Sequence, residues 1–134
     1  MAKILLLLAF LVGSVVGSTG ITRAQTQFEM NQSAARDLDK AESEMNASLA
    51  RLLKMAEGKP QSVAKLKQAQ SAWLAYREAQ VKAFWPSEDR LFYGSVHPMC
   101  VAMRLTSLTL ARVAELQQMT ARAEGDVCGY LWPD

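Results

Sequence analysis

Apolar side chains recur at helical spacing along the first long segment of the chain, from about residue 26 to residue 57. Their steps of three and four residues place them on one face of a helix: Ala34, Leu38, Ala41, Met45, Leu49 and Leu52. Thr26 and Glu29 have the spacing of a capping box, in which each side chain satisfies a free backbone N–H at a helix start. Gly58 and Pro60 are typical of a helix end. We therefore predict a helix over 26–57.

Two further segments have the same periodicity. The second covers 60–85, because Pro60 suits a first helical position and Pro86 pushes the residue before it out of helical geometry. Its predicted buried face contains Val63, Leu66, Ala69, Trp73, Tyr76, Gln80 and Phe84. The third helix is predicted to begin between Pro98 and Arg104 and to end near Ala123. One row of that helix contains Met103, Thr106, Leu110, Val113 and Gln117.

These three stripes predict the fold class. Helices that are polar on one face are stabilised by burying their apolar faces against each other. We therefore expect an all-α fold, a small antiparallel bundle of about three helices. The segment 86–97 contains Pro, Gly and Ser but also Leu91, Phe92 and Tyr93, so we expect a loop packed onto the bundle before the last helix.

The first 24 residues have a different character. Lys3 precedes an apolar run over 4–16 and then small residues, which is the order of a secretory signal peptide. A membrane-spanning helix needs about 20 apolar residues, and this run is shorter. We predict cleavage after Ala24, with Gly20 as the alternative site. The remaining chain, 25–134, is then a single exported domain, periplasmic or secreted, with no membrane anchor.

The charge balance changes with that cleavage. The chain has 15 basic and 13 acidic residues, and both Lys3 and Arg23 leave with the signal, so the mature domain is close to neutral. No basic patch with interleaved aromatic residues is present, which argues against a nucleic-acid partner.

The residues able to do chemistry are few. His97 is the one histidine and lies three residues before Cys100, so a Cys–His pair is conceivable, but a loop histidine beside a disulfide cysteine is the simpler interpretation. His97, Cys100 and Cys128 lack a fourth zinc ligand and the usual Cys-x-x-Cys spacing. No Gly-rich phosphate loop is present. We predict no catalytic site, no metal and no cofactor.

The two cysteines, Cys100 and Cys128, are expected to form a disulfide, because an exported chain seldom leaves its only two thiols free. A long straight helix from Cys100 would keep the pair apart. We therefore expect the last helix to begin nearer Met103 or Arg104, with Cys100 still in the loop.

Aromatic and charged residues are densest over 70–78. Trp73 and Arg77 are four residues apart and share a helix face. They could form a recognition patch. Because the cluster falls on the apolar stripe, we favour a structural role, with Trp73 and Tyr76 in the core and Arg77 stacked on the indole and paired with an acid of the first helix.

At these residues the sequence resembles a family, the small bacterial proteins grouped as the lysozyme inhibitor LprI-type N-terminal domain. The matching motif residues, which we interpret as structural, are Met30, Asn31, Gln70, Trp73, Tyr76, Arg77, Gly94, Ser95, Thr109 and Arg112. The motifs occur in the family's order over nearly the whole mature chain. Ser33 and Val81 stand where the family usually has Cys, so one disulfide of the family is missing.

The resemblance implies an exported helical domain and a role in binding and inhibiting lysozyme. Under that hypothesis the candidate partner-binding loop contains Ser87, Glu88, Asp89 and His97, and a second candidate surface is the acidic face with Asp37, Asp39, Glu42 and Glu44. The alternative is a periplasmic structural or interaction protein whose partner is another envelope or host protein.

Overall fold

Three helices make up nearly all of the described chain. The computed structural model describes residues 19–89 and 91–121, with side chains from Thr26 onward. The helices are α1 (Thr19–Met55), α2 (Pro60–Phe84) and α3 (His97–Thr120), and the described residues contain no strand. The predicted all-α class is confirmed.

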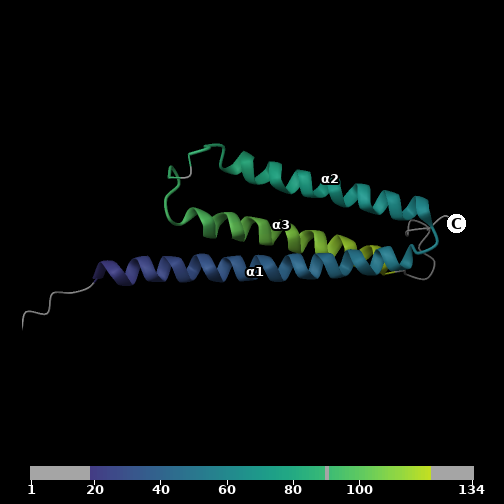
Figure 1. Ribbon diagram of the computed structural model, residues 1–134, viewed down its shortest axis with the longest axis horizontal. Helices are drawn as coiled ribbons and strands as arrows, with labels where there is room; N and C mark the ends of the chain where they lie inside the picture. Colours follow the sequence, from purple (N-terminus) through teal and green to yellow (C-terminus); the bar gives the residue numbers. More distant parts are fainter. Residues whose placement is uncertain (1–18, 90, 122–134) are drawn as a thin grey trace, which may run out of the picture.

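Successive helices run in alternating directions (Figure 1). Helices α1 and α3 are parallel and pack side by side, whereas α2 is antiparallel to both and approaches α3 closely over a much shorter stretch. The core lies toward the α1–α2 turn and is built from Met45, Leu52, Ala56, Leu66, Val113 and Leu116. No described helix is both apolar enough and long enough to cross a membrane.

The start of α1 differs from the prediction. The helix is already continuous at Thr19, so Thr26 and Glu29 lie inside it and the capping-box interpretation is wrong. The predicted cleavage after Ala24 would remove the first turns of this helix, and it remains a prediction. At the other end the turn forms as expected, because Gly58 has a φ of 82° and Pro60 opens α2.

The start of α3 also differs. The helix begins at His97, with Pro98 in its first turn, where the missing N–H of proline is no loss. The expectation that the helix begins near Met103 or Arg104 is therefore wrong, and Cys100 lies inside it as a free thiol. Cys128 lies outside the described residues. The Cα atoms of Cys100 and Thr120 are about 30 Å apart along the axis, so a bridge would need an almost fully extended chain between Thr120 and Cys128.

Two predicted faces are only partly buried. On α3 the buried positions are Ala102, Thr109, Val113 and Leu116, while Met103 and Leu110 of the predicted row are exposed. On α2 the buried positions are Ser62, Leu66 and Gln70, while Tyr76 and Phe84 are exposed. The placement of Tyr76 in the core was therefore wrong.

Candidate functional site

Arg77 joins all three helices. From α2, its Nη1 donates to Glu42 Oε1 of α1 at 2.7 Å and to Thr109 Oγ1 of α3 at 3.1 Å. The Arg77 side chain is 14% exposed and Thr109 is fully buried. The expected pairing of Arg77 with an acid of the first helix is thus confirmed, and Thr109 is an additional partner that the sequence analysis did not assign.

A second arginine makes a similar connection from α3. Arg112 Nε donates to Gln70 Oε1 at 3.2 Å, and the Gln70 amide donates in turn to the Met45 sulfur at 3.3 Å. Arg112 also pairs with Glu115 at 2.9 Å within α3. Gln70 is buried, so these bonds give its side-chain carbonyl and amide the partners that a buried polar group needs.

The Trp73 indole lies beside both guanidinium groups. The Arg77 Cζ atom is 5.3 Å from its ring centroid and the Arg112 Cζ atom 5.9 Å. Both distances are within the range of a cation–π contact. Trp73 is half-buried and packs against the core. We call Glu42, Gln70, Trp73, Arg77, Thr109 and Arg112 the polar seam, because their hydrogen bonds and ring contacts link the three helices.

Three further motif residues, Asn31, Gly94 and Ser95, lie at the loop before α3. Asn31 of α1 receives a hydrogen bond from Gln27 and donates through its own amide to the Ser95 carbonyl at 3.1 Å. Gly94 has a φ of 71°, a left-handed conformation that favours glycine, and no heavy atom lies within 4 Å of an added Cβ. Met30, next to Asn31, does not pack into the core and is 46% exposed.

The described residues of the loop before α3, 85–89 and 91–96, are bonded to one another. The Ser87 N–H donates to the Tyr93 hydroxyl at 2.8 Å, and Asp89 Oδ1 accepts from the Leu91 N–H at 2.9 Å. The His97 ring lies against Trp85 and Tyr93, with centroid distances of 5.4 and 4.6 Å. Ser87 and His97 therefore help to shape this loop rather than forming a free surface.

The tip of this loop is apolar and faces solvent. Leu91 is 87% exposed and Phe92 is 71% exposed, and the exposed Glu88 and Asp89 precede them. The expected packing of this loop onto the bundle is made by Tyr93, whose ring lies against His97, whereas Leu91 and Phe92 are exposed. We call Glu88, Asp89, Leu91 and Phe92 the loop tip.

The four acids of the first helix do not form one surface. Glu42 belongs to the polar seam, and Glu44 accepts a hydrogen bond from Gln117 of α3 at 3.3 Å. Asp37 lines a groove between α1 and α3, and Asp39 is exposed. The acidic-face prediction is therefore not supported as a single binding surface.

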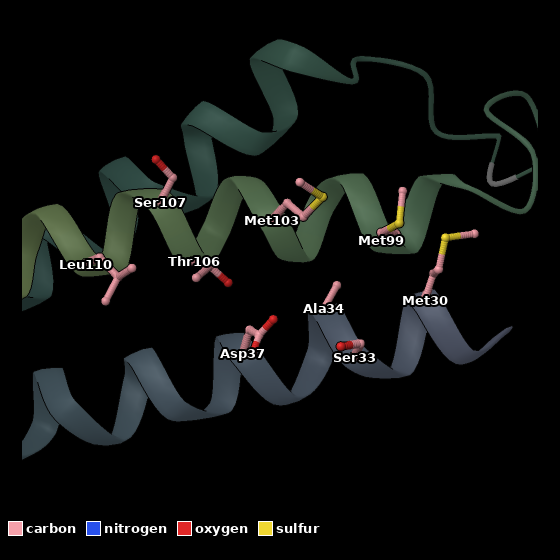
Figure 2. A pocket seen from close by; sticks show the side chains of 9 residues that line it. All are labelled: Met30, Ser33, Ala34, Asp37, Met99, Met103, Thr106, Ser107 and Leu110. Carbon is pink, nitrogen blue, oxygen red and sulfur yellow. The ribbon is translucent and has the colours of Figure 1, made fainter. Parts of the chain in front are cut away.

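The groove that contains Asp37 is open and has a volume of about 590 Å³. In Figure 2, Met30, Ala34 and Asp37 of α1 point toward α3, and Thr106 and Leu110 of α3 point toward α1. Its lining residues are Met30, Ser33, Ala34, Asp37, Met99, Met103, Thr106, Ser107 and Leu110. A smaller hollow of about 410 Å³ lies at the α1–α2 turn, around Pro60 and Val63.

Among the described residues, no three His, Cys, Asp or Glu side chains are grouped so that they could hold a metal ion. No curated protein and no solved structure matches the chain significantly. A family model does match, that of the lysozyme inhibitor LprI, and the match extends over residues 20–116. It includes the polar seam, the loop and the groove. Because the match covers most of the sequence, the chain belongs to the lysozyme inhibitor LprI family.

Proposed function

We propose that this protein is exported and that it binds and inhibits a lysozyme, acting as a binding module and not as an enzyme. The observation that carries the proposal is the family match over residues 20–116. The signal-like first 24 residues support export. An inhibitor needs a surface complementary to the cleft of its target, and it needs no catalytic group of its own.

The loop tip is the surface that we assign to lysozyme binding. A glycosidase of this kind carries two carboxyl groups in a substrate cleft, and a projecting loop can occupy such a cleft. Leu91 and Phe92 provide apolar area that is exposed in the free protein and would be buried in a complex. Glu88 and Asp89 would face the positive surface of a cationic lysozyme and raise the association rate.

Folding and binding are separable in this arrangement. Among the described residues no hydrogen bond, ion pair or ring contact joins the loop tip to the polar seam, and hydrogen bonds that Ser87 and Asp89 donate or accept hold the loop from within. Changes to the outward side chains should therefore alter the binding surface and leave the bundle folded, although Asp89→Lys also removes the acceptor of the Leu91 N–H within the loop.

The test is a cell-wall lysis assay with purified protein and lysozyme at near-stoichiometric ratio. We expect the unaltered protein to slow lysis. Leu91→Ser with Phe92→Ser should weaken inhibition, since buried aromatic anchors commonly contribute about 2 kcal/mol or more, roughly a thirtyfold loss of affinity. Glu88→Lys with Asp89→Lys should also weaken inhibition, and the loss should be larger at low salt than at high salt.

Matched controls are exposed residues away from the loop. Leu74→Ser on α2 controls for the loss of an exposed apolar group, and Asp39→Lys with Glu57→Lys controls for the charge reversal. Inhibition that is equally sensitive to the controls would reject the loop tip as the contact surface. No slowing of lysis by the unaltered protein would reject the proposal and favour an interaction protein with a different envelope or host partner.

A further inference from the structure

Three of the seven methionines of the chain line the groove between α1 and α3. Met99 and Met103 are four residues apart on α3 and therefore neighbours on one helix face. Met30 reaches toward them from α1, across the groove (Figure 2). Met30 and Met103 are 46% and 58% exposed, and Met99 is half-buried. These three side chains are thus at least partly open to solvent and not enclosed in the core.

The rest of the lining is suited to a cation. Asp37 is the one charged residue that lines the groove, and it is acidic. The remaining lining residues are neutral: Ser33, Ala34, Thr106, Ser107 and Leu110. No described lysine, arginine or histidine side chain lines it, so a bound positive charge would meet no repulsion from the groove wall.

Thioether sulfur is a soft and uncharged ligand. It binds soft ions such as Cu(I) in preference to Mg²⁺ or Ca²⁺, and it needs no deprotonation. A methionine side chain has three rotatable bonds, so sulfurs from two helices can adjust to a common centre. We propose that the groove binds a soft monovalent cation, Cu(I) or Ag(I), through the sulfurs of Met30, Met99 and Met103, with Asp37 balancing its charge.

Three other methionines of the described residues provide the contrast within the same molecule. Met45 is buried in the core, where its sulfur accepts the Gln70 amide. Met55 lies at the end of α1, and Met119 packs against the core from α3. None of these three lines the groove, so a cation held there should leave their methyl groups unaffected.

Silver is the probe, because Ag(I) is stable in air and resembles Cu(I) in its ligand preference. The protein carries Cys100→Ser and Cys128→Ser so that no thiolate competes, and circular dichroism checks its helicity. Silver nitrate is titrated into chloride-free buffer while the methionine methyl groups are followed by NMR. We expect the Met30, Met99 and Met103 methyl signals to shift together and to saturate at one silver per chain. If the serine pair unfolds the chain, Cys100→Ala with Cys128→Ala takes its place.

Leucine substitutions test the assignment, because exchange between methionine and leucine conserves volume. Met99→Leu with Met103→Leu should abolish saturable binding, and Met30→Leu alone should weaken it at least about tenfold, a loss that even indirect perturbation of a metal site can cause. Met55→Leu with Met119→Leu should leave affinity unchanged. The proposal is overturned by shifts of all methionines in parallel, by shifts of fewer than three groove methionines, or by equal effects of the two leucine pairs. None of these outcomes depends on lysozyme inhibition.

Discussion

Arg77→Leu is the substitution that most directly tests how the bundle is held together. It removes the hydrogen bonds from Nη1 to Glu42 and to Thr109, and it removes the guanidinium group beside Trp73. Leucine keeps the helix propensity of the position and fills part of the vacated volume. The change therefore isolates the polar contacts between α2 and the other two helices.

The expected cost is the sum of three contributions. The pair with Glu42 contributes about 1 kcal/mol, because the Glu42 side chain is 37% exposed and its charge is partly screened by solvent. Thr109 is fully buried and would lose a partner for its hydroxyl group, at about 1 kcal/mol or more. The contact with the indole contributes about 0.5–1 kcal/mol. Together these predict a loss of about 3 kcal/mol in the free energy of unfolding, a large part of the stability of a small domain.

Urea denaturation followed by circular dichroism measures this loss. With a slope of about 2 kcal/mol per molar urea, the midpoint should fall by about 1.5 M at unchanged slope. Arg51→Leu, at an exposed position of α1, is the matched control and should change stability by less than about 0.5 kcal/mol. A double-mutant cycle with Glu42→Gln isolates the ion pair. Equal midpoints for Arg77→Leu and Arg51→Leu would refute the role of the polar seam.

Three further outcomes are expected. Trp73→Ala should cost about 2–4 kcal/mol in urea denaturation, near the lower end for a large aromatic because the side chain is half-buried, whereas Tyr76→Ala should cost less than about 0.5 kcal/mol. Gly94→Ala should lower the free energy of unfolding by about 1–2 kcal/mol, measured in a thermal melt. The cost comes from the left-handed backbone alone, since an added Cβ meets no atom within 4 Å, and a cost near zero would contradict that conformation. Mass spectrometry of unreduced protein tests the predicted Cys100–Cys128 bridge; because α3 is helical from His97 to Thr120 and keeps Cys100 far from the chain end, we expect two free thiols, and an intramolecular bridge would contradict that geometry.

The existence and order of the helices could be predicted because each has a repeating apolar stripe and is separated from the next by Gly58–Pro60 or by Pro86. Their boundaries were less certain. Pro98 occurs equally well in a loop or in the first turn of a helix, and sequence alone did not distinguish the two. The capping-box spacing of Thr26 and Glu29 wrongly predicted a helix start, because the same residues are tolerated inside a helix when the chain before them is also helical.

The polar seam was predictable in part. The spacing of Trp73 and Arg77 indicates a shared face, and an arginine on an apolar stripe requires an acidic partner. The choice of Thr109 and the second guanidinium from Arg112 depend on the register of α3 against α2, which the sequence does not contain. The exposure of Leu91 and Phe92 was not predicted, because apolar residues in a loop are more often buried than presented to a partner.

The way α2 is attached has a consequence for how the molecule opens. Helices α1 and α3 approach each other closely, whereas α2 approaches α3 closely over a short stretch and is held by Leu66 in the core and by hydrogen bonds of Gln70, Arg77 and Arg112. Such an element should detach as a unit at a lower free energy than global unfolding. Amide hydrogens in the middle of α2 should then exchange with solvent sooner than those facing them on α1 and α3. The polar seam is then the interface that breaks first when the native state begins to unfold.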